Sequence, residues 1–282
     1  MKNTADHYCL FNKQLLPISE LSIPLQFNRA FRYGDGLFET IRVIDGHPQL
    51  LSKHWDRLRN GMQFLQVAIP EEWSANFWQQ QIGRLTADTG NWRIRLSVFR
   101  QAAGLYTPNS NHCNFLLECM PLPNDRYEPN LEGLNIHICQ SIRLSTHALS
   151  QHKTLNALPY VLAGLEKQKN GWDDALLLNE QGQVAEACSS NIFLLLNGEL
   201  LTPPLTDGCV AGVMRRHILE VAPQLGLVVR EASLSIEQIE QGEELFLSNA
   251  IQGIKWVKQL NNRTFGQNLY PKLLQQINLR IE

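Results

Sequence analysis

The segment 153–193 constrains the fold of this chain more than any other, because it predicts a helix and two strands in sequence. It begins K-T-L-N-A-L and ends V-A-E-A-C-S-S-N-I-F. Helical periodicity predicts a helix over Leu155–Lys169. Two short apolar runs then predict strands at Ala175–Leu178 and Val184–Ala187, joined by a turn at E-Q-G-Q. The segment therefore predicts a helix followed by a β-hairpin.

Two residues of this segment have the chemistry of a cofactor site. Lys153 stands just before the predicted helix, and Glu186 lies one hairpin away. A lysine amine can form an imine with pyridoxal phosphate, and a carboxylate can pair with the protonated pyridine nitrogen of that cofactor. Either residue alone is more often an ordinary surface side chain, so the rest of the chain must decide.

Composition narrows the possible classes of protein. The chain has 282 residues, of which 44% are hydrophobic and 18% charged, as in folded globular proteins. Its net charge of -2 gives no basic surface for nucleic acid or a membrane. It has neither a signal-peptide pattern nor an apolar stretch of the roughly 20 residues that a membrane helix needs. The six scattered cysteines lack C-x-x-C spacing, which favours reduced thiols, a cytoplasmic location and no metal site.

The first half of the chain contains a motif, Y-G-D-G-L-F-E-T-I-R, that leads into a predicted strand. The strand turns at Asp45-Gly46. A helix follows with Ser52 as its N-cap, and Arg57 lies off its apolar stripe. Arg57 is therefore either a solvated side chain or one that binds phosphate with its planar guanidinium. A second helix is predicted over 71–85.

Further along, an alternating pattern predicts a strand at 91–100, and another strand is predicted at 114–119. Residues 121–130 carry three prolines and no periodicity, which is typical of a linker. We therefore expect a smaller N-terminal α/β domain (1–120), a linker (121–130) and a larger C-terminal domain (131–282) that binds the cofactor.

In the second half, a loop rich in proline and glycine opens a helix near Gly212. Exposed N–H groups at a helix N-terminus, with a glycine that allows close approach, form an anion site. The alternative is a long surface loop before an ordinary capped helix.

These motifs together carry a resemblance to a known family. They are Y-G-D-G-L-F-E-T-I-R, H-W-D-R-L, K-T-L-N, E-A-C-S-S-N-I-F, A-G-V-M-R and S-N-A-I-Q-G-I, in this order from about Tyr33 to Val257. The chain resembles the fold-type-IV pyridoxal-phosphate family of branched-chain aminotransferases, D-amino acid aminotransferases and 4-amino-4-deoxychorismate lyases. The resemblance implies a two-domain α/β (α+β) fold like that of D-amino acid aminotransferase, with pyridoxal 5′-phosphate in the interdomain cleft.

The resemblance also implies roles for individual residues. Lys153 would be the catalytic Schiff-base lysine, Glu186 the partner of the pyridine nitrogen, and Arg57 a ligand of the phosphate. The remaining expected cofactor contacts are Ser190, Asn191, Gly212, Val213, Met214, Asn249, Ala250 and Ile251. Some relatives have a threonine where Ala250 stands, so one phosphate hydrogen bond would either be lost or be supplied by backbone or water.

The motif details favour one activity within the family. Branched-chain enzymes typically read F-E-G-I-R and have a glycine-rich sequence after the lysine, whereas this chain has Thr40 and K-T-L-N. D-amino acid aminotransferases carry a tyrosine where Phe38 stands, and an R-x-H carboxylate trap that is missing from the loop after Arg100. The pattern is most like that of 4-amino-4-deoxychorismate lyases, which release pyruvate and 4-aminobenzoate in the folate pathway. We expect substrate contacts from Phe38, Thr40, Arg100 and Tyr106.

Several alternatives stay open. The chain could be a class IV aminotransferase that acts on branched-chain or D-amino acids, or, more remotely, a cofactor-binding protein without turnover. A purely structural protein would not need all of these residues together. The resemblance further implies a homodimer in which the loop Gly104–His112 reaches the substrate of the neighbouring subunit. The alternative is a hairpin loop that lies on its own domain.

Overall fold

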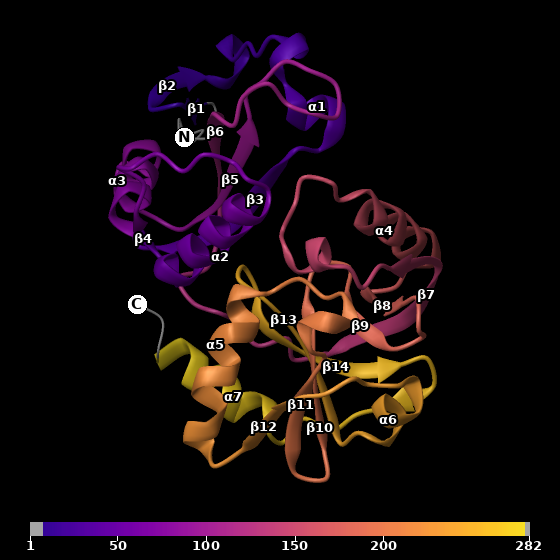
Figure 1. Cartoon of the computed structure of the whole chain (residues 1–282). Coiled ribbons are helices and arrows are strands. Elements are labelled where there is room, and N and C mark those ends of the chain that lie inside the picture. The colour runs from indigo at the N-terminus through magenta and orange to yellow at the C-terminus, as the bar shows by residue number, and fades with distance from the viewer. Residues whose placement is uncertain (1–7, 280–282) are drawn as a thin grey trace. The chain divides into compact units, whose positions relative to one another are not determined.

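The computed structural model describes residues 8–279, and these form two compact units. The first unit comprises residues 8–126 together with Lys153–Asn156, and the second comprises Tyr127–His152 and residues 157–279. The domain boundaries expected from the sequence stay a prediction, and their parts 1–7 and 280–282 lie outside the described residues. Each unit is built around its own β-sheet (Figure 1).

The sheet of the first unit is antiparallel, with the strand order β2-β1-β6-β5-β3-β4. The two strands predicted at 91–100 and 114–119 form β5 and β6, which pair along their whole length. The strands and helices of this unit are β1 (Tyr8–Phe11), β2 (Gln14–Pro17), α1 (Arg29–Tyr33), β3 (Gly36–Ile44), β4 (His47–Pro48), α2 (Leu51–Phe64), α3 (Ala75–Thr86), β5 (Trp92–Arg100) and β6 (Cys113–Pro121).

An apolar core joins α2 and α3 to this sheet. Leu58 and Met62 of α2 are buried one helical turn apart, and the sheet contributes apolar residues such as Ile41 and Ile94. The rings of Trp73 and Trp78 pack edge to face with centroids 4.6 Å apart. Such aromatic pairs contribute about 0.5–1.5 kcal/mol beyond the apolar area that they bury.

Both helices begin at residues that differ from the sequence prediction. The second helix starts at Ala75 and not at 71, because the Ser74 hydroxyl accepts a hydrogen bond from the Phe77 N–H and caps it. The first helix starts at Leu51, directly after Leu50 in a left-handed conformation (φ 55°). Ser52 is therefore inside α2 and is not its N-cap, since local polarity alone did not reveal the preceding bend.

The K-T-L-N segment pairs with β3, although the sequence predicted that the helix would begin within it. Thr154 forms an antiparallel bridge with Leu37, and the Leu155 N–H donates to the Gly36 carbonyl over 2.9 Å. A Cβ at Gly36 would lie 2.7 Å from Leu155 Cδ1 and 2.5 Å from the Val98 carbonyl oxygen, so only glycine fits there. This pairing explains the second glycine of G-D-G and delays the helix to Leu158.

The sheet of the second unit has the order β12-β11-β10-β13-β14-β7-β8-β9, with β15 beside β14. It is mixed, because β7 runs parallel to both β8 and β14 while β10, β13 and β14 are antiparallel. Its elements are β7 (Leu134–Leu144), α4 (Leu158–Asn170), β8 (Asp174–Asn179), β9 (Val184–Ala187), β10 (Asn191–Leu196), β11 (Glu199–Thr202), α5 (Val213–Val221), β12 (Val228–Glu231), α6 (Ile236–Gln241), β13 (Glu244–Asn249), β14 (Gly253–Leu260), β15 (Arg263–Thr264) and α7 (Tyr270–Leu279).

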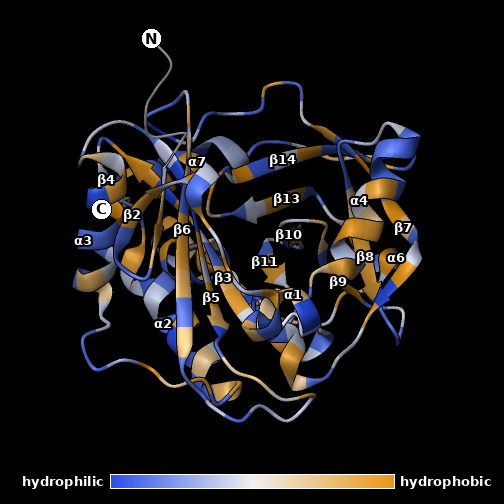
Figure 2. Cartoon of the chain, turned by 90° about the horizontal axis from the view of Figure 1, so that it is seen from above, coloured by the Kyte–Doolittle hydropathy of each residue, from blue (hydrophilic) through white to orange (hydrophobic). Residues whose placement is uncertain are grey.

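The strands of this sheet carry most of the apolar core of the second unit. Figure 2 shows hydrophobic residues along β8 and β10, which agrees with the burial of Leu176, Ile192 and Leu194. A separate cluster, which includes Ala163 and Ala185, packs α4 against β7, β8 and β9. Within residues 8–279, no helix has the length and apolar character needed to cross a membrane.

Candidate active site

Lys153 lies against β3 in the first unit. Its carbonyl oxygen accepts a hydrogen bond from the Phe38 N–H over 2.9 Å, which fixes the backbone. Its Nζ lies 4.3 Å from the centroid of the Phe38 ring. The aromatic face stabilises the ammonium form of a lysine. The lysine predicted to be catalytic is therefore held by strand pairing at its backbone and by a ring at its amine.

A buried ionic cluster is formed by Glu39 of β3 with His54 and Arg57 of α2. The carboxylate accepts from Arg57 Nε over 2.8 Å and from Arg57 Nη2 over 2.5 Å, so the pair is bidentate. His54 Nδ1 lies 2.6 Å from Glu39 Oε2. Both Glu39 and His54 are 1% exposed. Burial alone would raise the pKa of Glu39, but the Arg57 charge and hydrogen bonds, aided by His54, lower it to about 2.

His54 is a neutral member of this cluster at neutral pH. Burial lowers the pKa of its imidazole, the Glu39 carboxylate opposes this, and the charges of Arg57 and Lys153 lower it further. A neutral ring beside a carboxylate carries its proton on the nitrogen that faces the carboxylate, which is Nδ1. Its Nε2 is buried and has no hydrogen-bond partner among the described residues.

Arg57 is the residue for which the sequence allowed either a solvated face or a phosphate role. Its side chain is 12% exposed and its guanidinium is fixed by Glu39, so it is not a freely solvated arginine. Phe38 and Thr40, the expected substrate contacts on β3, are half-buried. The Arg95 guanidinium of β5 lies 4.1 Å from the centroid of the Phe38 ring, and Thr40 is the strand partner of Arg95.

Arg100 lies inside the first unit. It is 5% exposed, and its Nε donates to Asp35 over 3.0 Å. Its terminal nitrogens donate to the carbonyls of Leu65 and Gln66 and to the Asn111 side chain. These bonds hold the end of β5 and the following loop, and its expected role at the substrate stays a prediction.

Tyr106 lies at the tip of that loop and is 88% exposed. The loop is anchored from below, because Arg29 donates to the carbonyls of Leu105 over 2.6 Å and Tyr106 over 3.1 Å. Arg29 in turn forms an ion pair with Asp35 at 2.7 Å, and Asp35 also binds Arg100. The central Asp of G-D-G thus joins two buried arginines that together fix the loop.

Glu186 lies on β9 of the second unit and is 3% exposed. Its Oε1 accepts from the Tyr160 hydroxyl over 2.6 Å. Its Oε2 accepts from the Val210 N–H over 3.1 Å and from Asn191 Nδ2 over 3.3 Å. Both oxygens of this buried carboxylate thus accept hydrogen bonds, which reduces the cost of its burial.

Asn191 connects this carboxylate to the N-terminus of α5. Its Nδ2 also donates to the Val210 carbonyl over 2.8 Å. A Cβ placed on Gly212 would collide with Asn191 Oδ1, so only glycine fits at the start of the helix. Gly212 is the N-cap of α5 and supplies no side-chain cap, which leaves the first N–H groups of the helix for an anion.

Val213 and Met214 follow this N-cap with buried side chains, 3% and 1% exposed. They could therefore contact a phosphate only through their backbone. The predicted second loop is a tight turn, in which Asn249 Oδ1 accepts from the N–H groups of Ile251 and Gln252. Asn249 Nδ2 donates to Ser190 Oγ over 3.0 Å, which joins the two predicted loops.

Each unit contains residues whose chemistry suits one part of pyridoxal phosphate. The first unit offers an amine on Lys153 and a fixed guanidinium on Arg57, which suit an aldehyde and a phosphate. The second unit offers a buried carboxylate on Glu186 and an uncapped helix start at Gly212. Taken unit by unit, these donors and acceptors have the chemistry that the cofactor needs.

The sequence alone did not identify three residues of these clusters. Glu39 and His54 lie within the motifs F-E-T-I-R and H-W-D-R-L, and His54 is one helical turn before Arg57, which could have indicated a shared face. Tyr160 gave no such signal, because it lies on α4 whereas its partner Glu186 lies on the strand β9, 26 residues away in the chain.

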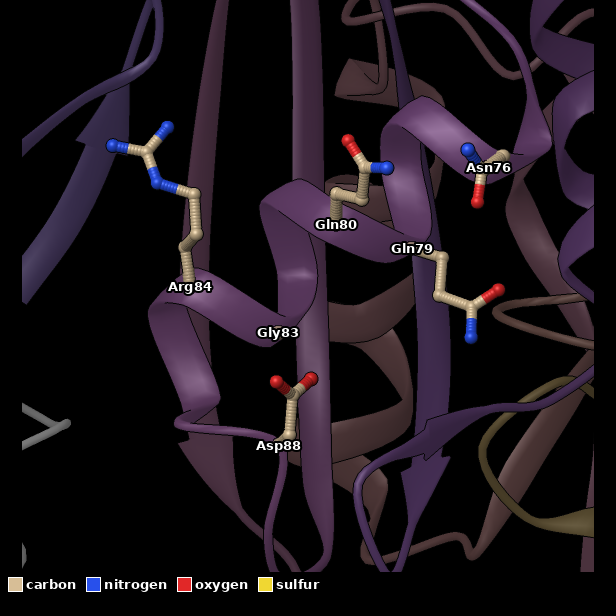
Figure 3. A pocket seen from close by; sticks show the side chains of 6 residues that line it. All are labelled: Asn76, Gln79, Gln80, Gly83, Arg84 and Asp88. Carbon is tan, nitrogen blue, oxygen red and sulfur yellow. The ribbon is translucent and has the colours of Figure 1, made fainter.

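A cavity lies on α3, and none of its lining residues belongs to these clusters. It has a volume of about 400 Å³ and is lined by polar side chains and one glycine: Asn76, Gln79, Gln80, Gly83, Arg84 and Asp88. Figure 3 shows these amide and charged side chains around the outside of the helix. In the part of the chain that the structure describes, no group of histidine, cysteine and acidic side chains could hold a metal ion.

The chain is similar to known proteins over nearly its whole length. It matches the amino-transferase class IV family over residues 36–260. It is 28% identical over 260 residues to a putative branched-chain-amino-acid aminotransferase of Methanocaldococcus jannaschii, covering 89% of this chain and 87% of that protein. It is 26% identical over 239 residues to an aminodeoxychorismate lyase of Vibrio harveyi, covering 84% and 87%.

A solved structure gives the same picture. The crystal structure of 4-amino-4-deoxychorismate lyase from Pseudomonas aeruginosa has a TM-score of 0.82 and 29% identity, covering 95% of this chain and 97% of that chain. The fold expected from the resemblance is therefore confirmed, as are the expected cofactor, pyridoxal phosphate, and the expected enzyme class. The chain belongs to the class IV amino-transferase family of pyridoxal-phosphate-dependent enzymes.

Proposed function

We propose that this protein is a pyridoxal-phosphate-dependent 4-amino-4-deoxychorismate lyase, which releases pyruvate and 4-aminobenzoate. The observation that carries the proposal is the pairing of K-T-L-N with β3, in which Leu155 packs directly on Gly36. A glycine-rich segment after the lysine, as in branched-chain enzymes, would lack this side chain. The likeness to lyases from Vibrio harveyi and Pseudomonas aeruginosa supports the same choice.

The loop after β5 supports the lyase over a D-amino acid aminotransferase. It has no R-x-H motif, and the arginine nearest to it in sequence, Arg100, donates to Asp35, to Asn111 and to two carbonyl groups. An enzyme that traps substrate carboxylates at this loop would need a cationic group directed toward the substrate.

The roles of the residues follow from their local geometry. When bound, pyridoxal phosphate supplies an electron sink for the carbon that bears the substrate amine. Lys153 would hold the cofactor covalently until the substrate amine displaces it, and its Nζ would then take the proton from that carbon. Glu186 would hold a proton on the pyridine nitrogen, and Arg57 with the α5 N-terminus would bind the phosphate. The proposal assigns these groups to one cofactor, as the family resemblance implies.

The other predicted contacts take part in the same proposal. Ser190, Asn191 and the turn of Asn249, Ala250 and Ile251 would line the cofactor. Phe38, Thr40 and Tyr106 would contribute to substrate binding directly, and Arg100 would do so by holding the base of the loop that carries Tyr106. We also propose a cytoplasmic homodimer. The exposed tip of Gly104–His112 supports the dimer, and the unbridged thiols at all six cysteines support the location.

A second function is favoured by one observation, the 28% identity to the putative branched-chain-amino-acid aminotransferase. One experiment separates the two functions. The purified protein is given 4-amino-4-deoxychorismate, and separately leucine or D-alanine with 2-oxoglutarate. Formation of 4-aminobenzoate and pyruvate is the expected result, whereas glutamate formation without 4-aminobenzoate would identify an aminotransferase. Bound cofactor with no product in any mixture would indicate a binding protein.

A further inference from the structure

We propose that Tyr160 is a positioning residue for Glu186, and that its hydroxyl keeps this carboxylate ionised and in one orientation toward the cofactor. The inference rests on the proposed function, because it assumes that Glu186 faces a pyridine nitrogen. The hydroxyl of Tyr160 donates to Oε1 over 2.6 Å, while Asn191 and Val210 donate to Oε2. Each carboxylate oxygen is thus held by its own donors, which fixes the plane of the group.

The tyrosine ring is placed by packing that does not need the hydroxyl. Tyr160 is the third residue of α4, and its ring packs against the apolar cluster that contains Ala163, Leu177 and Ala185. A phenylalanine would make the same apolar contacts. The hydroxyl is therefore present for the carboxylate, and its removal tests a single hydrogen bond.

The groups around the carboxylate keep the phenol a donor. Burial, and then the charge of Glu186, raise the pKa of Tyr160 far above its usual range, so the phenol stays protonated. Cys209 is a second titratable group affected by the carboxylate, and burial followed by the Glu186 charge raises the pKa of that thiol to about 12. Neither group changes its charge near neutral pH.

The bond between Tyr160 and Glu186 should have a measurable effect on proton affinity. A hydrogen bond to a charged group contributes about 1.5–3 kcal/mol. At about 1.36 kcal/mol per pH unit, its loss should raise the titration midpoint of the Glu186 carboxyl by roughly one to two units. A carboxyl group with higher proton affinity competes with the pyridine nitrogen for its proton, so the electron sink becomes weaker.

The experiment first measures the cofactor-free protein. Glutamate side chains are labelled at the carboxyl carbon, and the NMR signal of Glu186 is assigned by its loss in Glu186→Gln. Tyr160→Phe should raise the midpoint by roughly one to two units. Tyr270→Phe removes another buried hydroxyl of the second unit, which binds the Asn130 N–H, and should leave the midpoint unchanged. An unchanged midpoint in Tyr160→Phe would overturn the proposal.

The second measurement uses the cofactor-loaded enzyme. In Tyr160→Phe we expect a shifted pH titration of the cofactor absorbance. We also expect a kcat about tenfold lower, which corresponds to a change of about one pH unit in the proton affinity of Glu186, with KM little changed. If the variant does not fold, 3-fluorotyrosine at position 160, a stronger donor, should lower the Glu186 midpoint instead. A moved midpoint with unaltered absorbance and kcat would overturn the role toward the cofactor. Wild-type protein that binds no pyridoxal phosphate would overturn the proposed function, while the cofactor-free titration would still measure the bond.

Discussion

Replacing Glu39 by glutamine should destabilise the first unit, because this carboxylate is the shared partner of His54 and Arg57. The pKa of Glu39 is lowered from 4.5 to about 2 in the folded protein, a change of roughly 2.5 units. At about 1.36 kcal/mol per unit, this corresponds to about 3 kcal/mol of unfolding free energy at pH 7. Loss of one partner from a buried ion pair is similarly costly, about 3–5 kcal/mol.

The pH dependence gives a second test of the same reasoning. A group with a lowered folded pKa stabilises the protein fully above its unfolded pKa, here 4.5, and loses this effect as the pH falls toward about 2. The stability difference between wild type and Glu39→Gln should therefore stay near its full value down to pH 5. It should then narrow by roughly 1 kcal/mol at pH 3.5. His54 affects stability at higher pH. Because its pKa is lowered from 6.5 in the folded protein, the unfolded chain binds more protons as the pH falls below 6.5, and the folded state becomes less stable.

The assay is urea denaturation of the cofactor-free protein followed by tryptophan fluorescence. It reports chiefly on the first unit, which contains four of the six tryptophans, namely Trp55, Trp73, Trp78 and Trp92. Glu72→Gln is the matched control, because Glu72 and its partner Lys13 are both half exposed to solvent. This substitution should not measurably change the free energy of unfolding. A loss below about 1 kcal/mol at pH 7, or a difference that does not narrow in acid, would refute the argument.

The remaining predictions concern catalysis and assembly. Lys153→Ala should abolish turnover and the visible absorbance band of the cofactor-linked enzyme, and retention of both would exclude its role. Glu186→Gln should keep the cofactor bound but slow the reaction by orders of magnitude, measured as kcat, because a neutral amide cannot hold the pyridinium proton. Arg57→Ala should weaken cofactor binding by about 1.5–3 kcal/mol, measured as a dissociation constant, and should slow the saturated enzyme much less. Mixing the inactive variants Lys153→Ala and Tyr106→Ala should restore part of the activity if subunits share sites; a fully active monomer would contradict this.

The sequence predicted the parts of the fold that local patterns determine. Strict alternation over 91–100 predicted β5, and Asn170-Gly171 correctly marked the end of α4, where Gly171 adopts φ 70°. The start of α4 was wrong because Lys153–Asn156 pairs with β3, a strand more than a hundred residues away in the chain. No local periodicity can reveal such a pairing, although Gly36, which it requires, was visible as part of G-D-G.

The residues of the candidate site likewise divide into those that local motifs predict and those that depend on contacts between distant parts of the chain. Residues that belong to motifs, such as Lys153 and Glu186, could be named from the resemblance. Their partners could not, because a hydrogen bond such as that from Tyr160 depends on the register between a helix and a strand. The sequence also gave no reason to expect that Arg100 would lie buried at the base of its loop, with Asp35 as a partner.

The two buried glutamates illustrate how surroundings decide what a carboxylate can do. Glu39 is held by the Arg57 guanidinium, so its charge is compensated where it lies and its role is to fix that arginine. Among the donors of Glu186 within the second unit are three neutral groups, a phenol, an amide and a backbone N–H. Neutral donors reduce the cost of burying a charge without cancelling it. A carboxylate with such donors can also pair with a protonated ring nitrogen, which is the cation that the proposed reaction requires.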